Sequence, residues 1–477
     1  PNPKPQTPNP KPQTPKWLGE VRCSENDEVK AFVLKSDYKM SAVQFFYLAW
    51  ILSRFCVEGH EFVQSRNAHI LSYSLLGQYL SPQVTFQKTF NFADISFDSQ
   101  FPSGHLQDVQ RRGSDAFIVT VGADPYSPDP SPEEEEFKNW FYFRVKNAKT
   151  ARKISLKITN MSSRLGIFHH GMYVSYSSNV RTGGKWGMLR NNLTISLAGQ
   201  SMQLDFDYSM NAGEEVRFAL AEPYTKKRLD AFLNRFITLA QAAPGFFVHR
   251  EVLTRTQMGN EIELLRISAR EKRVRTPFFP ATEPSSPVGS REKCSVVLSA
   301  RVHPAETPAS FMLEGTLNYL LSQRDTPAIT KLLSDCIFYV IPMLNPDGVE
   351  LGLTRSDVNG INLNSIYLSA DASTPAVDAL KRVVAHLQRT NGFHFYADFH
   401  SHMAQRGFFL YGKAVQGYAD GAVLLFPLVM KRLDPRLRVE AGKFSEGGKT
   451  STSKQYFSKL QSTPAVYTFE CNYWGPS

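Results

Sequence analysis

The sequence predicts an α/β fold, a mixed, largely parallel sheet flanked by helices, preceded by an antiparallel β-sandwich domain. Two observations predict it. Residues 294–471 alternate short apolar runs with helical segments, which is the pattern of a parallel sheet covered by helices. Residues 139–208 hold short runs rich in β-branched and aromatic side chains, which are typical of antiparallel strands.

The chain has 477 residues, enough for two or three domains besides its tail. Residues 1–15 contain the sequence PNPKPQT twice and are a Pro-rich, low-complexity tail, which favours extended and solvated structure. Residues 16–90 have a globular composition but no motif that assigns them. We expect the β-sandwich domain over residues 91–245 and the α/β domain over residues 246–477.

The individual elements follow from local patterns. Two expected helices begin at a Thr-Pro pair, which suits an N-cap followed by a first helical residue. In the sandwich domain we expect strands at 139–147, 153–161 and 193–208, then a helix at 226–239. In the α/β domain we expect a strand at 294–300, a helix from Thr307-Pro308 to about Leu321, a strand at 336–344 ending in a turn at 345–348, a helix from Thr374-Pro375 to about Gly392, and a strand at 393–399.

Composition limits the partners and the compartment. The formal net charge of +10 and the pI near 9.2 fit either simple solubility or an acidic partner, nucleic acid or an acidic protein tail. No motif supports nucleic-acid binding. The five cysteines form no CxxC pair, which is typical of a reducing compartment without disulfides. The most apolar run, residues 42–55, is too short for a membrane span, so we expect no membrane association.

Three expected strand ends carry residues with chemical potential. His303 and Glu306 follow strand 294–300, His400 follows strand 393–399, and Glu470 lies in the last apolar run. Two imidazoles and one carboxylate are a ligand set of catalytic zinc, leaving the fourth position to water. A further carboxylate outside the metal's ligands must then take the proton from that water. Glu470 is the candidate for this general base.

Each of these features alone has a plainer interpretation. A His and a Glu three residues apart occur by chance in many proteins, and a His at a strand end is more often a core or surface residue. The zinc prediction depends on three such sites at the strand ends of one α/β sheet, because ligands of such sheets gather where strands end in loops.

Four ordered motifs resemble those of the cytosolic carboxypeptidases, and more narrowly the member type that removes branch-point glutamate from tubulin. The motifs are SARVHPAETPASFMLEG (299–315), IPMLNPDGVELGLTRSDVNGINLN (341–364), FYADFHSHMAQRGFFLYG (395–412) and YTFECNY (467–473). The upstream runs ISFDSQFPSGHL (95–106), NWFYFRV (139–145) and RFALAEPYTKKRLDAFL (217–233) are similar to the β-sandwich domain of that family.

The resemblance implies one zinc ion per chain and assigns roles by position. His303, Glu306 and His400 match the zinc ligands of the family, and Glu470 matches its general base. His402 lies next to this site, and we expect it to support the site rather than bind the metal.

Substrate-binding positions match less completely. Arg355 matches the arginine that stabilises the oxyanion, and Asn364 matches the asparagine of an Asn-Arg pair that binds the terminal carboxylate of the substrate. The arginine of that pair is replaced by Ser365, which cannot bind a carboxylate bidentately.

Two further departures concern the end of the chain. The active-site tyrosine of the family is replaced by Ser458, with Tyr456 two residues away, and Lys449 and Lys454 are nearby cations that could compensate. The chain ends at Ser477, where the family continues into a closing helix, so we expect a C-terminally truncated domain.

The resemblance therefore implies a cytoplasmic zinc metallocarboxypeptidase that removes glutamate from acidic, glutamate-rich tails such as those of tubulin, with association with microtubules or cilia as a further expectation. An alternative is a catalytically impaired pseudo-carboxypeptidase that binds such tails, which Ser365 favours and the intact Glu470 opposes. A nucleic-acid binder is a third alternative that rests on net charge alone.

Overall fold

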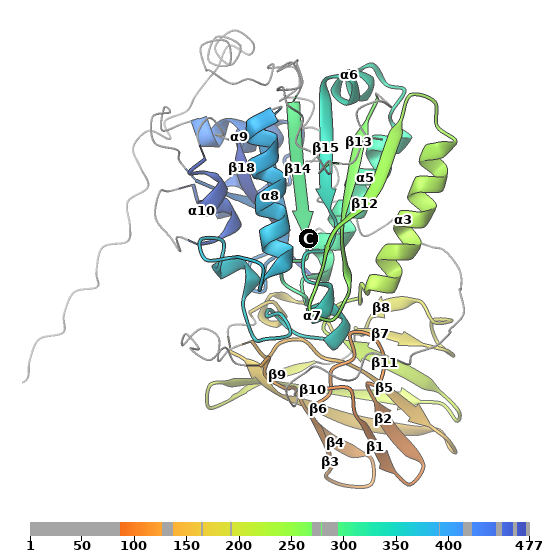
Figure 1. Ribbon diagram of the computed structural model, residues 1–477. Helices are drawn as coiled ribbons and strands as arrows, with labels where there is room; N and C mark the ends of the chain where they lie inside the picture. Colours follow the sequence, from red (N-terminus) through yellow and green to blue (C-terminus); the bar gives the residue numbers. More distant parts are fainter. Residues whose placement is uncertain are drawn as a thin grey trace, which may run out of the picture.

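The computed structural model describes residues 86–125, 137–163, 166–190, 193–269, 278, 294–390, 392–413, 422–444, 451–460 and 465–473. The Pro-rich tail and residues 16–85 lie outside this set, as does most of the acidic stretch 125–136. Figure 1 shows two layered parts, a β-sandwich below and an α/β part above. Within the described residues, no helix is both long and apolar enough to cross a membrane.

The lower part is a sandwich of two sheets that share one hydrophobic core. Its strands alternate buried and partly exposed side chains, most clearly in β10, because only one face of each sheet meets the core. Along the first sheet the strands are β1 (Thr89–Phe92), β2 (Ile95–Asp98), β5 (Tyr142–Asn147), β11 (Glu215–Ala219), β7 (Ser175–Ser178) and β8 (Trp186–Met188). Along the second they are β3 (Asp108–Arg111), β4 (Ala116–Thr120), β6 (Arg152–Ser162), β10 (Ser201–Met210) and β9 (Thr194–Ala198).

The predicted sandwich is thus present, with two differences in detail. All its strand pairs are antiparallel except β4 with β6, which is parallel. The run 193–208 was expected as one strand, but it forms the antiparallel pair β9 and β10. The chain reverses at Gly199, whose φ of 61° is readily adopted by glycine.

The upper part contains one mixed sheet of seven strands. Its four central strands are parallel, and antiparallel strands lie at both edges. In spatial order the strands are β12 (Phe247–Arg255), β13 (Glu261–Ser268), β15 (Cys336–Ile341), β14 (Cys294–Ala300), β16 (Phe395–Ser401), β18 (Val466–Cys471) and β17 (Phe408–Gly412). The four central strands are buried along their whole length, as expected of a sheet covered on both faces.

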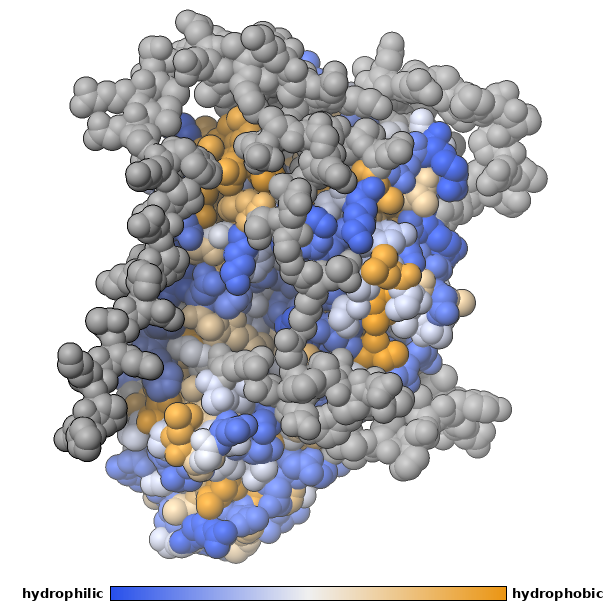
Figure 2. Space-filling model, turned by 90° about the vertical axis from the view of Figure 1, so that its left-hand side faces the viewer, coloured by the Kyte–Doolittle hydropathy of each residue, from blue (hydrophilic) through white to orange (hydrophobic). Residues whose placement is uncertain are grey.

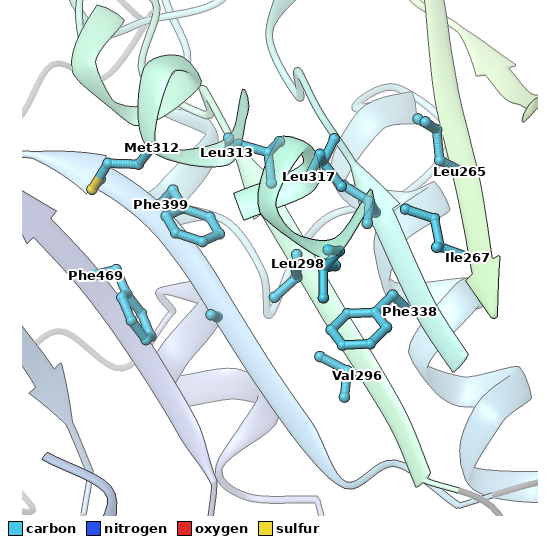
Figure 3. Close-up of a cluster of buried hydrophobic side chains, with 14 of the residues drawn as sticks. Leu265, Ile267, Val296, Leu298, Met312, Leu313, Leu317, Phe338, Phe399 and Phe469 are labelled. Atoms are coloured by element: carbon cyan, nitrogen blue, oxygen red, sulfur yellow. The ribbon is translucent and has the colours of Figure 1, made fainter. Parts of the chain in front are cut away.

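Helices cover both faces of this sheet. Alternate strand residues such as Val296 and Leu298 pack on one side against α5, as Figure 3 shows, and α3, α6 and α9 belong to the same cluster. The neighbouring residue Val297 faces the other side, where α8 and α10 pack. The helices are α3 (Lys226–Gln241), α5 (Thr307–Ser322), α6 (Pro327–Asp335), α7 (Pro346–Leu351), α8 (Pro375–Thr390), α9 (Ala422–Leu433) and α10 (Ser453–Phe457), with short 3₁₀ turns η2 (Phe168–His170), η3 (Leu363–Ser365) and η4 (Val439–Ala441).

Two local predictions were wrong. Thr307 was expected to cap α5, but the N-cap is Glu306, whose side chain makes no capping bond because it faces two histidines instead. The expected turn at 345–348 is the first turn of α7, capped by Asn345, whose side-chain oxygen accepts a hydrogen bond from the Gly348 N–H at 2.9 Å.

The molecular surface is mixed in character. On the face shown in Figure 2, hydrophilic and apolar residues are interspersed over the parts that are not grey. Figure 1 shows the arrowheads of β14 and β15 directed toward the sandwich, so the carboxyl ends of these strands lie on the side of the α/β part that faces it. Sites in α/β sheets gather at such ends.

Candidate metal centre

The loop between β14 and α5 brings two candidate ligands together. The chain turns at Arg301, whose φ of 59° is unusual for a residue other than glycine. The buried guanidinium of Arg301 holds the turn by donating to the carbonyl oxygens of Tyr224 and Pro304. His303 and Glu306 then lie on one side of the loop, with 2.8 Å between His303 Nδ1 and Glu306 Oε1.

The third candidate ligand comes from the neighbouring strand. His400 lies in β16, and its Nδ1 is 3.0 Å from Glu306 Oε2 and 3.2 Å from His303 Nδ1. The three side chains are buried, and one ligand atom from each lies within 4.8 Å of the others. Among the described residues, these three side chains form a group of potential ligands that could hold a metal ion.

The hydrogen bonds around the site fit a cation. His400 Nε2 is 3.0 Å from Asp398 Oδ2, and His303 Nε2 is 3.2 Å from Asn362 Oδ1. Because both partners are oxygen acceptors, each Nε2 carries a proton, and a neutral ring then presents the lone pair of its Nδ1. Two lone pairs and a carboxylate thus converge, which is a donor set that binds zinc.

The surroundings of the three side chains shift their pKa values. Burial and the nearby Arg355 lower the pKa of His303 to about 4, which favours the neutral ring. Although burial alone would lower it, the carboxylates of Asp398 and Glu306 raise the pKa of His400 well above its ordinary value. Against the effect of burial, the two histidines lower the pKa of Glu306 well below its usual range.

Asp398 is a functional residue that our sequence reasoning missed. Its carboxylate contacts His400 and accepts hydrogen bonds from the hydroxyls of Ser299 and Ser453, both at 2.8 Å. A signal was present in the sequence, because Asp398 is the one acid in the apolar run 395–399 and lies two residues before His400, on the same side of the strand.

Comparisons with known proteins identify the family. A family model described as zinc carboxypeptidase matches residues 233–464, and one described as the cytosolic carboxypeptidase N-terminal domain matches residues 97–219. The chain belongs to the cytosolic carboxypeptidase family. The candidate ligands lie inside the first match, and Glu470 lies beyond its end at residue 464.

Curated relatives agree with this assignment. Cytosolic carboxypeptidase 2 of Danio rerio is 31% identical over 71% of this chain and 45% of the relative. Cytosolic carboxypeptidase-like protein 5 of Homo sapiens is 31% identical over 61% of this chain and 37% of the relative. Cytosolic carboxypeptidase 6 of Caenorhabditis elegans is 26% identical over 80% of this chain and 79% of the relative. The chain thus spans less than half the length of the first two relatives.

A solved structure confirms the predicted fold class. The metallo-carboxypeptidase from Burkholderia cenocepacia matches with a TM-score of 0.61 and 22% identity, over 80% of this chain and 90% of that chain. At this identity the match shows a shared fold.

The candidate base Glu470 lies beside the candidate metal centre. It lies in β18, directly opposite His400 of β16 in the parallel ladder. Burial raises the pKa of Glu470 to about 8, and the charge of Glu306 adds to the effect. Its carboxylate is therefore close to the candidate ligands, while the three-residue metal group does not include it.

Arg355 reaches the same site from the loop after α7. Its Nη1 is 3.6 Å from Glu306 Oε1, and its guanidinium lies 5.5 Å from the centre of the Phe137 ring. The side chain is 37% exposed, so it borders both the buried ligands and solvent. This is a suitable position for a cation that meets a bound substrate.

The two residues at the position of the predicted carboxylate clamp make contacts within the chain. The side-chain oxygen of Asn364 accepts a hydrogen bond from the Ser453 N–H at 3.1 Å, which anchors the start of α10. The Ser365 hydroxyl donates to the backbone oxygen of Asn362 at 2.7 Å. Ser365 is thus engaged with the backbone of η3.

Of the two lysines expected to bind substrate, Lys454 can be located, whereas Lys449 lies outside the described residues. Lys454 Nζ lies 3.4 Å from the Gly412 oxygen and 5.5 Å from the centre of the Tyr411 ring. Burial lowers the pKa of Lys454 to about 8, Glu470 opposes this shift, and Lys413 and Lys443 add to it. Lys454 therefore interacts electrostatically with the candidate base and with two further lysines.

The remaining predicted positions have structural contacts. Tyr456 packs with Tyr367 and Phe457, and the Ser458 hydroxyl donates to the Gln455 oxygen at 3.2 Å. Neither residue is among the contacts of the metal ligands given above. His402 Nδ1 accepts hydrogen bonds from two backbone N–H groups of the following turn, at 3.1 and 3.0 Å, and stays outside the ligand group.

Proposed function

We propose that this chain is a zinc-dependent metallocarboxypeptidase that removes C-terminal or branch-point glutamate from polyglutamylated proteins. The observation that carries the proposal is the convergence of His303, Glu306 and His400 at the ends of neighbouring parallel strands, with Glu470 opposite one of them. Membership of the zinc carboxypeptidase family supports the same reaction class.

The metal ligands, Glu470 and Arg355 have different roles in the proposed peptide hydrolysis. When held by His303, Glu306 and His400, zinc would polarise the scissile carbonyl and lower the pKa of its bound water. Glu470 takes the proton of the attacking water and passes it to the leaving amine. The guanidinium of Arg355 stabilises the negative charge that develops on the carbonyl oxygen.

A preference for glutamate is supported by the charges around the candidate base. Lys454 interacts electrostatically with Glu470 and with Lys413 and Lys443, and the chain carries a net charge of +10. Positive charge at a site attracts anionic substrates and orients them. An acidic protein tail is therefore the substrate class we propose, with tubulin as the substrate protein and the cytoplasm as the place of action.

Ser365 favours a second candidate, a protein that binds acidic tails without cleaving them. With its hydroxyl bonded to Asn362, Ser365 cannot replace the bidentate contact that arginine makes with a carboxylate. If the first proposal holds, Ser365→Arg should raise kcat/KM on glutamate-ending peptides. The gain should correspond to about 1.5–3 kcal/mol of added transition-state stabilisation, the range for hydrogen bonds to charged groups.

The test is release of the last residue from synthetic peptides, followed by mass spectrometry. The substrates are tubulin-tail peptides carrying a linear glutamate chain or a single branch-point glutamate, and the controls are the same peptides ending in Leu or Lys. We expect release of glutamate and little release of the control residues. Glu470→Gln should reduce kcat by about 100- to 10,000-fold, because it keeps the size of the side chain but cannot accept the proton.

The outcomes separate the two candidates. Binding of the peptides without release of glutamate, by both the wild type and Ser365→Arg, would favour the binding protein. A fully active Glu470→Gln variant would show that another group is the base.

A further inference from the structure

The sandwich contacts one stretch of the α/β part along its whole length, residues 349–356, which we call the bridging segment. The contacts are the Ser103 hydroxyl to the Val349 oxygen at 2.7 Å, Gln87 Nε2 to the Glu350 oxygen at 3.1 Å, His105 Nδ1 to the Gly352 oxygen at 2.7 Å, and the N–H groups of Asn139 and Trp140 to Thr354 Oγ1 at 3.1 and 3.2 Å. All of them come from residues of the sandwich part. The bridging segment also carries Arg355.

The fit between the two parts is close at Gly352. Its φ is 69°, and a Cβ atom there would lie 2.6 Å from the Gly104 oxygen. Both the backbone conformation and the lack of space require glycine at this position. The bridging segment is therefore packed directly on the backbone of the sandwich.

Asp124 makes the densest contact of this interface. Its Oδ1 accepts from the Thr354 N–H at 2.7 Å, and its Oδ2 accepts from the Arg355 N–H at 2.7 Å and from the N–H and hydroxyl of Ser356, both at 2.9 Å. The residue is 4% exposed. All of these partners are donors, so they match a carboxylate, which only accepts.

Asp124 also connects to the environment of the Arg355 side chain. Its own N–H donates to the Phe137 oxygen at 2.8 Å, and the Phe137 ring lies under the Arg355 guanidinium. The sandwich part therefore contacts Arg355 twice, at its backbone through Asp124 and at its guanidinium through Phe137. The other end of that guanidinium lies 3.6 Å from Glu306.

We propose that Asp124 is a positioning residue for Arg355, by which the sandwich domain fixes the backbone from which the guanidinium reaches the metal centre. The inference rests on the proposed function, because the work of Arg355 is stabilisation of the oxyanion. An arginine aimed at that charge helps only if it is fixed before the reaction, and a displacement of about 1 Å can cost about 100-fold in rate. The sandwich is on this account a part of the active site.

The experiment compares three single variants and one double variant. Asp124→Asn keeps the shape of the side chain but turns one acceptor into a donor that faces backbone N–H groups. Ser103→Ala is the matched control, because it removes a buried hydrogen bond of the same interface away from Arg355. Arg355→Ala and the double variant Asp124→Asn with Arg355→Ala complete a double-mutant cycle. Melting temperature and zinc content are measured for every protein, so that rates are compared only between folded proteins that contain zinc.

Asp124→Asn should lower kcat on a glutamate-ending peptide by about 10- to 100-fold with little change in KM, and Ser103→Ala should change kcat less than about twofold. In the Arg355→Ala background the effect of Asp124→Asn should vanish. Hydrogen exchange of the amides of residues 354–356 should accelerate in Asp124→Asn but not in Ser103→Ala.

Equal losses of kcat in both backgrounds, or unchanged exchange at residues 354–356, would overturn the inference. An inactive wild type would instead contradict the proposed function. In that case the four proteins of the cycle are compared by their Kd for a phosphinate peptide ending in glutamate, which mimics the oxyanion. Additive effects on that Kd would also overturn the role of Asp124.

Discussion

At the scale of single residues, each candidate ligand is fixed by a second contact that decides which atom it presents. Asp398 holds His400, Asn362 holds His303, and the Ser401 N–H donates to Glu306 at 2.9 Å. Such partners orient metal ligands, and removing one typically costs 10- to 100-fold in metal affinity. The ligands themselves were recognisable in the sequence because their spacing and residue types match a motif. Asn362 was not, because a buried amide has no signature of its own.

Lys454 provides a pH test of substrate binding. With its pKa near 8, the amine is charged below that pH and neutral above it. Raising the pH from 7 to 9 should therefore raise KM for a glutamate-ending peptide, by at most about tenfold, since about a tenth of the amine stays charged one unit above its pKa. Lys454→Arg stays charged over this range and should keep KM nearly constant. The charged neighbours Lys413, Lys443 and Glu470 are the same in both proteins. An equal rise of KM in both would exclude Lys454 as the titrating group.

At the scale of elements, the apolar runs of the sequence predicted the central strands well, because a strand buried on both faces needs apolar side chains throughout. The starts of α3 and α8 lie where they were predicted, but the cap of α5 does not. Thr307 has the right chemistry for a cap, but Glu306 occupies the cap position and its carboxylate contacts His303 and His400. A local rule failed here because a functional contact across the sheet outweighs it.

His105, which contacts the bridging segment, should make the unfolding free energy depend on pH. Its Nε2 accepts from the Gly122 N–H, so Nδ1 carries the proton that is donated to Gly352. Burial lowers the pKa of His105 to about 4, with Lys88 adding to the effect. Because the folded-state pKa lies below the unfolded value, the unfolded chain gains a proton first as the pH falls. This residue should therefore remove about 3 kcal/mol from the unfolding free energy between pH 6.5 and 4.

Urea unfolding at several pH values measures this loss. His105→Gln cannot titrate, so its unfolding free energy should fall less steeply over the same range. Parallel pH profiles for the two proteins would show that His105 does not carry the effect.

At the scale of the whole molecule, the sequence predicted the sandwich and the mixed sheet but not how they meet. The hydrogen bonds between Asp124 and residues 354–356 join positions about 230 residues apart, and no local sequence pattern predicts them. The meeting of the candidate ligands was predictable, because parallel strands present their carboxyl ends at one edge of the sheet. The contribution of the sandwich to that edge is a property of the folded chain alone.

The metal centre is the central claim of this account, and the zinc content of the purified protein tests it most directly. We expect close to one zinc per chain by elemental mass spectrometry, and loss of most of it in His303→Ala and in His400→Ala. His402→Ala is the matched control, since its ring nitrogen is occupied by backbone N–H groups, and it should keep its zinc. Full zinc retention in both ligand variants would contradict the account.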